Sequence, residues 1–343
     1  MKPSGQTRDS PKWILALLGA GLVLAGCERS PMTSVQRGYR GDGQVQIINP
    51  RMLAAKYERM SIPEASPPAE GGEPKASAAF KNVQVLGDLS AGQFTRVMVA
   101  MASWIAPEQS CGYCHKAGED FSSDSLYTKV VARRMLQMTR RINSHWQAHV
   151  GSTGVTCFTC HRGQPVPANI WFGNPLSQPS NGYAGWKNQQ NIPAMQVGLT
   201  SLPFDPFTPF LQQSGQVRVE ATQALPGGPG ASIQQTEWTY ALMMHISKAL
   251  GVNCTYCHNS RQFASWDQSS PPRVTAWYGI RMVRELNNDY LASVAPVFPP
   301  NRLGPLGDGP KLNCATCHDG AYKPLYGAKM LKDFPELADG PPP

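Results

Sequence analysis

The pattern C-x-x-C-H occurs four times in this chain and constrains it more than any other feature. The copies begin at Cys111 (CGYCH), Cys157 (CFTCH), Cys254 (CTYCH) and Cys314 (CATCH). Two cysteines at this spacing, followed directly by histidine, are the attachment signature of c-type haem. The thiols add to the vinyl groups of one porphyrin, and the histidine gives an imidazole to its iron. The sequence therefore predicts four haem c groups, held by Cys111, Cys114, Cys157, Cys160, Cys254, Cys257, Cys314 and Cys317.

The cysteine count argues against a structural disulfide or a zinc site. Of the nine cysteines, eight lie in the motifs and the ninth is Cys27, so none is expected in a structural disulfide. Two cysteine-rich zinc sites are the alternative, but zinc would not require a histidine directly after each pair. The motif histidines, expected as the first axial ligands, are His115, His161, His258 and His318.

Composition and charge agree with a chain built around large cofactors. There are 32 glycines and 31 prolines among 343 residues, with an ordinary hydrophobic content of 41%. This mixture predicts much irregular structure and a core completed by bound groups. The formal net charge is +8, which the propionates of four haems would offset. Because no basic run with interleaved aromatic residues is present, the charge does not indicate nucleic-acid binding.

The N-terminus predicts export and a lipid anchor. A basic segment precedes an apolar run over Trp13–Leu24, which has 12 residues, where a bilayer crossing needs roughly 20. Residues 1–26 are therefore expected to be a signal peptide. The sequence LAGC, which ends at Cys27, resembles the bacterial lipobox. That resemblance implies acylation of Cys27, which would hold the mature chain on the periplasmic face of the inner membrane.

Helical periodicity precedes each motif, so we expect a mainly α chain with extensive irregular loops. Ser90 and Gln93 form a capping-box pattern, and Leu89 with Phe94 form a hydrophobic staple. Apolar spacing continues from there to Ile105. Further helices are expected over residues 126–150, closed by Gly151, and over residues 232–251 and 273–294.

The order helix, motif, helix, motif occurs twice, which indicates an internal duplication of a two-haem unit. The stretch ARRM at 132–135 also resembles GIRM at 279–282. The expected fold is a multihaem c-type cytochrome with two pseudo-symmetric two-haem helical units. The expected segments are a lipoprotein signal peptide (1–26), an extended N-terminal arm (27–85), a first two-haem unit (86–165), a connecting loop region (166–231), a second two-haem unit (232–322) and a Pro-rich C-terminal tail (323–343).

An electron carrier normally fills the sixth position of each iron as well, and methionine there raises the potential relative to histidine. Three of the expected helices carry methionines shortly before a motif, although packing in a core is the commoner role of methionine. Spacing leaves a choice within each pair: Met98 or Met101 for the first haem, Met135 or Met138 for the second, and Met243 or Met244 for the third.

The fourth haem has two candidates, Met282 and His149. Met282 follows from the repeat. His149 lies 14 residues after Met135, about four turns or roughly 21 Å along one helix, so a single helix could serve two haems. His149 could equally be a histidine favoured by the dipole at a helix C-terminus. His145 lies roughly 80° around the helix from Met135 and is the weaker candidate, and His245 has no assigned role.

Several stretches resemble the tetrahaem cytochrome subunit of the photosynthetic reaction centres of purple bacteria. They are KNVQVLGDLSAGQFTRVM, VVARRMLQMTRRIN followed by WQAH, TGVTCFTCHRGQPVP, ALMMHISKALGVNCTYCHN and AWYGIRMVREL. The resemblance implies Met98, Met135 and Met243 as the sixth ligands of the first three haems, and His149 with His318 on the fourth. It also implies a line of haems in the order first, second, fourth, third, with the third nearest the oxidised bacteriochlorophyll pair.

The function that follows is electron transfer without bond chemistry, so the chain is not expected to be an enzyme by itself. The implied partners are the L and M subunits, the H subunit of the same complex, and a soluble periplasmic donor. That donor would be a c-type cytochrome or a high-potential iron–sulfur protein. The alternatives are a periplasmic multihaem reductase, which needs an iron with an open face, and a quinol-to-periplasm relay, which needs a transmembrane helix. An extracellular metal-reducing relay fits the motif contexts poorly.

Overall fold

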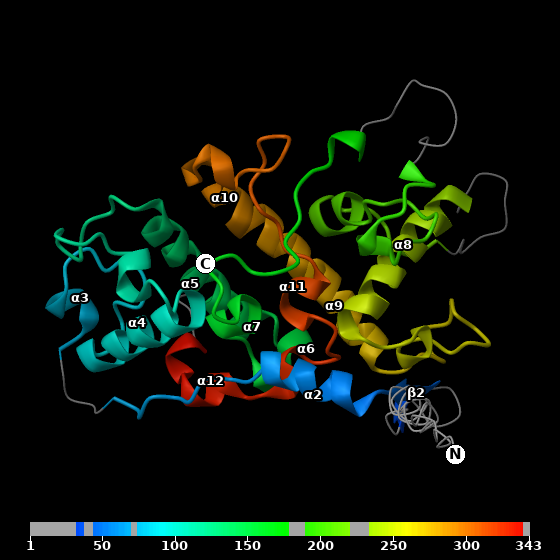
Figure 1. Ribbon diagram of the computed structural model, residues 1–343, viewed down its shortest axis with the longest axis horizontal. Helices are drawn as coiled ribbons and strands as arrows, with labels where there is room; N and C mark the ends of the chain where they lie inside the picture. Colours follow the sequence, from blue (N-terminus) through cyan, green and yellow to red (C-terminus); the bar gives the residue numbers. More distant parts are fainter. Residues whose placement is uncertain (1–31, 38–43, 70–73, 178–188, 220–232, 339–343) are drawn as a thin grey trace, which may run out of the picture.

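The computed structural model describes residues 32–37, 44–69, 74–177, 189–219 and 233–338. Within these ranges the chain is mainly helical with many irregular stretches, as predicted. Figure 1 shows α4 and α5 on one side and α8 and α9 on the other, with α6, α7 and α11 between them. No helix of the described ranges has both the length and the apolar character that crossing a bilayer requires.

The first predicted helix is α4 (Ala91–Ile105), and it begins with the expected cap. The Gln93 backbone N–H donates to Ser90 Oγ at 3.2 Å, and the Ser90 N–H donates to Gln93 Oε1 at 3.0 Å. The two bonds satisfy donors that the first helical turn cannot pair internally. The buried face of α4 includes Val97 and Trp104.

The second predicted helix is interrupted. Instead of one helix over residues 126–150, the structure has α5 (Tyr127–His145) and α6 (Gln147–Val150). The break is at Trp146, whose ψ of 31° leaves the helical range. Because α6 packs against α9, the chain turns there to reach the second half. The prediction that one straight helix carries both Met135 and His149 is therefore wrong. The predicted helix end at Gly151, whose φ is +56°, is confirmed.

The other two long helices lie where they were expected. Helix α8 (Ile233–Leu250) ends before Gly251, whose φ is +63°. Helix α9 (Pro272–Glu285) continues into the π-helical η8 (Leu286–Leu291) and then α10 (Ala292–Val294).

Both ends of the described chain contain more structure than the sequence analysis expected. The N-terminal arm forms an antiparallel hairpin of β1 (Thr33–Arg37) and β2 (Gln44–Ile48), followed by α2 (Pro50–Arg59). At the other end, α12 (Met330–Asp333) and η12 (Pro335–Leu337) pack into the body of the molecule. The remaining short elements are α3 (Ala76–Ala79), η2 (Gly151–Thr153), η3 (Pro175–Ser177), η5 (Met195–Val197), η6 (Thr208–Gln212), η9 (Ala295–Val297), η10 (Pro300–Arg302) and η11 (Pro324–Gly327).

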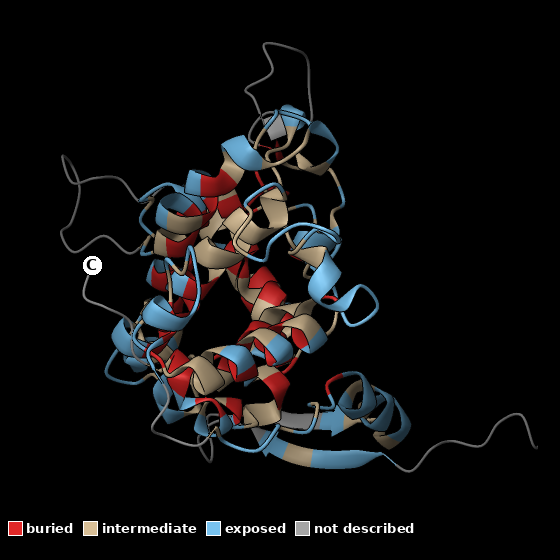
Figure 2. Cartoon of the chain, turned by 90° about the vertical axis from the view of Figure 1, so that its left-hand side faces the viewer, coloured by how far each residue is buried: buried red, intermediate tan, exposed pale blue. Residues whose placement is uncertain are grey.

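Buried side chains form two clusters. The first cluster joins α4 to the C-terminal segment and includes Val97, Trp104, Phe334 and Leu337. The second cluster joins α5, α8 and α9, with members such as Ile142, Leu242 and Ile280. Figure 2 shows buried residues on the helices of the body, while the hairpin below it is mostly exposed. Each cluster therefore contains residues from both the N-terminal and the C-terminal parts of the chain.

Candidate haem sites

The four motifs adopt two kinds of turn. The first and third lie at 3₁₀ turns, η1 (Ser110–Tyr113) and η7 (Cys254–Tyr256). The second and fourth form short α-helices, α7 (Cys157–His161) and α11 (Cys314–His318). Both α-helical motifs begin with a capping box, Thr156 with Thr159 in α7 and Asn313 with Thr316 in α11. The same alternation in both halves agrees with a duplicated unit.

Each motif histidine is oriented by a backbone carbonyl. Nδ1 lies 3.1 Å from Phe121 O in His115, 2.8 Å from Gln164 O in His161, 3.0 Å from Phe263 O in His258 and 2.9 Å from Ala321 O in His318. A carbonyl oxygen can only accept, so Nδ1 carries the proton in each ring. Nε2 keeps its lone pair, which is the arrangement that a metal-binding imidazole requires.

His149 has the same arrangement outside the motifs. Its Nδ1 donates to Thr275 O at 2.9 Å, which leaves Nε2 free to bind a metal. The ring centroids of His149 and His318 lie 6.1 Å apart. Imidazole nitrogen–metal bonds measure about 2 Å, and the centroid lies roughly 1 Å beyond the nitrogen. Two imidazoles on opposite faces of one iron would therefore have centroids roughly 6 Å apart, close to the spacing here.

The two other non-motif histidines lie elsewhere. His145 is exposed and its ring makes an edge contact with Trp146 at 5.4 Å between centroids. His245 is buried with its ring against Phe207. Among the described residues, His149 is the non-motif histidine whose ring lies beside that of a motif histidine.

Burial keeps the site residues uncharged. It lowers the pKa of His318 to about 4, and it lowers the pKa of His149 as well. Burial also raises the pKa of the Cys157 and Cys314 thiols to about 12. Among the described residues, no group of three or more His, Cys, Asp or Glu side chains is placed to hold a metal ion.

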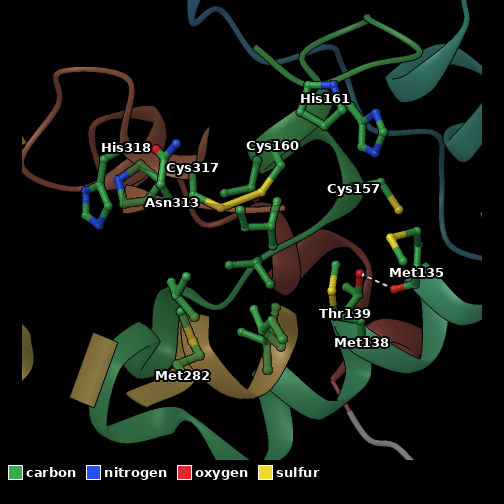
Figure 3. A pocket seen from close by; sticks show the side chains of 18 of the residues that line it. Met135, Met138, Thr139, Cys157, Cys160, His161, Met282, Asn313, Cys317 and His318 are labelled. Carbon is green, nitrogen blue, oxygen red and sulfur yellow. Dashed lines mark hydrogen bonds between the residues drawn. A yellow bond between two sulfur atoms is a disulfide. The ribbon is translucent and has the colours of Figure 1, made fainter. Parts of the chain in front are cut away.

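A single cavity of about 870 Å³ joins most of the site residues. Its lining is mainly apolar and includes residues of the second and fourth motifs, Cys114 of the first and Tyr256 of the third. This is within the size range of ligand and cofactor pockets, about 300–1,000 Å³. Figure 3 shows His161, Cys160, Cys317 and His318 along one side and Met135 and Met138 on another. Residues and space therefore fit a large planar, apolar group such as haem.

One feature departs from the sequence analysis. The sulfur atoms of Cys160 and Cys317 are joined as a disulfide, with their Cα atoms 4.6 Å apart (Figure 3). The expectation that no cysteine forms a disulfide is therefore wrong for the chain in this structure. A sulfur in a disulfide cannot also carry a thioether, so this bond and haem attachment at these two positions exclude each other. The two sulfur atoms lie together because α7 packs against α11. Haem attachment at the second and fourth motifs requires both cysteines as free thiols, so the haem-loaded chain would lack this bond.

The methionine choices stay predictions. Met98 is partly buried and packs against the first cluster, while Met101 is buried and lines the cavity. Met135, Met138 and Met282 all line the cavity. Met243 packs against the second cluster, and Met244 lies near Gly198. Cys27 lies outside the described residues.

Two positions that the sequence analysis did not single out as site residues contact His149. The Thr275 carbonyl oxygen holds its ring, and no sequence signal reveals a backbone acceptor. Gly279, one turn further along α9, lies directly against the same ring. Here a signal existed, since glycine inside a helix is unfavourable and suggests a packing or functional reason.

Comparisons with known proteins point to one family. A family model described as photosynthetic reaction centre cytochrome c subunit matches residues 28–338. The photosynthetic reaction center cytochrome c subunit of Rubrivivax gelatinosus is 54% identical over 94% of this chain and 88% of that protein. The subunit of the same name from Thermochromatium tepidum is 48% identical over 93% and 78%, and that of Roseobacter denitrificans 42% identical over 94% and 90%.

Proposed function

Because the chain belongs to the photosynthetic reaction centre cytochrome c subunit family, we propose that it carries four haem c groups and re-reduces the photo-oxidised bacteriochlorophyll pair. It is an electron-transfer cytochrome subunit of the photosynthetic reaction centre complex. Bound haem supplies one-electron chemistry between ferric and ferrous iron. The chain's own residues then determine where each iron lies and at what potential.

The observation that carries the proposal is the pair of histidines at the fourth motif. The ring centroids of His149 and His318 lie 6.1 Å apart, and backbone carbonyls fix both rings with Nε2 unprotonated. We assign them as the two axial ligands of the fourth haem. The first three haems take His115, His161 and His258 on one side and Met98, Met135 and Met243 on the other. Histidine in place of methionine lowers the potential, so the fourth site is a low-potential site among higher ones.

Packing between motifs supports the order first, second, fourth, third. Helix α4, which carries Met98, packs against α7 of the second motif, α7 packs against α11 of the fourth, and α11 packs against α8, which carries Met243. The common cavity runs through the same residues, from Cys114 to Tyr256. Electrons would enter at the first motif and leave at the third.

The surfaces at the two ends support different partners. At the first motif Cys111 is exposed, as is the neighbouring Phe121, which fits a transient contact with a soluble c-type cytochrome or high-potential iron–sulfur protein. Near the third motif Phe263, whose ring lies against His258, and Trp266 are exposed. Aromatic residues are enriched at stable interfaces, so this end fits the L and M subunits. Acylation of Cys27 would keep the chain on the periplasmic face of the membrane.

Flash spectroscopy on membranes tests the function directly. After a flash bleaches the bacteriochlorophyll pair, haem absorbance should show oxidation as the bleaching recovers, and reaction centres lacking this subunit should recover without that signal. Haems that stay reduced while the pair recovers would refute the proposal. Carbon monoxide tests the alternative reductase, because eight filled axial positions leave the native ferrous protein no site to bind it.

A further inference from the structure

Two buried asparagines occupy equivalent places in the two halves. Asn143 on α5 donates through Nδ2 to Val155 O at 2.9 Å and accepts from the Val155 N–H through Oδ1 at 2.8 Å. Asn287 in η8 makes the same pair of bonds with Leu312, at 3.0 and 2.7 Å. Val155 and Leu312 each lie two residues before an α-helical motif. The asparagines therefore fix how one half aligns with the other.

This alignment corrects the repeat register used in the sequence analysis. Matching Asn143 with Asn287 places residues 132–143, ARRMLQMTRRIN, on residues 276–287, AWYGIRMVRELN. Alanine, methionine, arginine and asparagine then coincide at four positions, and leucine exchanges with isoleucine at two more. The earlier register, which paired Met135 with Met282, is shifted by three residues. Met282 corresponds to Met138, and the counterpart of Met135 is Gly279.

Gly279 lies against the imidazole of His149. A Cβ atom placed on Gly279 would lie 2.5 Å from Cε1 and 2.8 Å from Nδ1 of His149. Such distances are far inside van der Waals contact, so any side chain at position 279 would displace the ring. Gly279 is buried within α9, one turn after Thr275, whose carbonyl oxygen holds His149 Nδ1. Glycine is among the poorest residues for a helix interior, and this close approach gives a reason for it.

We propose that Gly279 selects the sixth ligand at the fourth motif. At the position where the first half carries Met135, the second half has no side chain, and the space admits His149 from the other half. One residue difference thus accounts for both the missing methionine and the added histidine. This proposal rests on the axial assignments above, because it explains how His149 comes to serve the fourth haem.

Two substitutions test it in the assembled, haem-loaded complex. Gly279→Ala adds one methyl group where the ring lies, and should move the most reducing step of the redox titration to higher potential and lose the paramagnetic resonance signal of a bis-histidine ferric haem. The ferrous variant should gain carbon monoxide binding at one haem. Gly279→Met restores the residue of the first half, and should add the absorption band of methionine-ligated ferric haem without carbon monoxide binding. Val274→Ala, at an exposed site on the same helix, is the control and should leave all four steps in place.

A double substitution separates this proposal from the ligand assignment. If Gly279→Ala acts through the ring, adding it to His149→Ala should change nothing further at the low-potential step. A low-potential step that moves in His149→Ala but not in Gly279→Ala or Gly279→Met would overturn the role of Gly279 alone. A step unchanged in His149→Ala would overturn the ligand assignment, and with it this proposal. If Gly279→Met does not accumulate, the single methyl of Gly279→Ala still decides the question.

Discussion

Acid should destabilise this protein through His245, a buried histidine of α8 that has no assigned ligand role. Its side chain is 5% exposed, its Nε2 has no hydrogen-bond partner among the described residues, and its ring lies edge-on to Phe207 at 4.6 Å between centroids. Burial, opposed by a backbone hydrogen bond with Gln196 and reinforced by the charge of Lys248, lowers the pKa of His245 to about 4 from the ordinary 6.5. The folded protein therefore strongly favours the neutral ring.

The sign and size of the effect follow from linkage. Between pH 6.5 and 4 the unfolded chain binds a proton at this histidine and the folded protein does not, so acid favours unfolding. At about 1.4 kcal/mol per pH unit, the contribution of His245 to the free energy of unfolding falls by about 3 kcal/mol over this window. It is fully present above pH 6.5 and does not decline further below pH 4.

Urea unfolding of the purified haem-loaded subunit, repeated from pH 8 to pH 4, measures this loss. His245→Phe keeps an aromatic ring against Phe207 but cannot be protonated, so its free energy of unfolding should fall about 3 kcal/mol less than that of the wild type over the same window. His145→Phe, at an exposed histidine, is the matched control and should parallel the wild type. If the profiles of His245→Phe and the wild type run parallel between pH 6.5 and 4, the reasoning is refuted.

Three further changes have defined outcomes. Arg96 and Glu336 form a buried ion pair at 3.2 Å, so Arg96→Met should lower the free energy of unfolding by about 3–5 kcal/mol. Adding Glu336→Leu should recover part of that loss, because no unpaired charge then remains buried. Equal stability of the single and double variants would contradict this. Asn287→Ala leaves buried backbone groups near the fourth motif unpaired, at about 1–3 kcal/mol each, and should perturb the low-potential haem in a redox titration while the first haem keeps its potential. Cys27→Ala should abolish fatty-acid incorporation in metabolic labelling, and label retained by the variant would rule out the lipobox.

Local signals in the sequence predicted local structure well. The capping box of Ser90 and Gln93 involves residues three apart, and the helix begins there as expected. The helix ends at Gly151 and Gly251 could be predicted in the same way, because glycine adopts a positive φ without steric cost. The break at Trp146 could not be predicted from the sequence, because it follows from the packing of α6 against α9, which is far away in the sequence.

Tertiary contacts also explain why both ends were described as too irregular. Proline-rich composition predicted a C-terminal tail, but Phe334 and Leu337 are buried in the first cluster. Arg96 on α4 reaches across to Glu336 and to the Asp333 carbonyl, which fastens that segment to the body. Composition alone cannot show that two apolar side chains in a proline-rich segment pack against residues far away in the sequence.

In the candidate site, too, local features could be predicted from the sequence and tertiary contacts could not. The motif cysteines and histidines could be named from the sequence because haem attachment needs a fixed local spacing, and their role stays a prediction. The contacts of His149 were not, because a backbone carbonyl at Thr275 and a missing side chain at Gly279 orient it. Spacing left His149 and Met282 equal as candidates. The choice between them stays a prediction, and the three-dimensional register adds that Met282 corresponds to Met138 and not to Met135.

The corrected register has a consequence for the whole molecule. Under the proposed assignments, three haems take both axial ligands from one half of the chain: Met98 with His115, Met135 with His161, and Met243 with His258. The fourth site differs, because His149 comes from the first half and His318 from the second. A duplicated unit with a methionine at position 279 would have been complete in itself. Under the same proposal, glycine at this position would make the second half depend on α6 of the first, so the change that lowers one potential would also link the two halves at one haem.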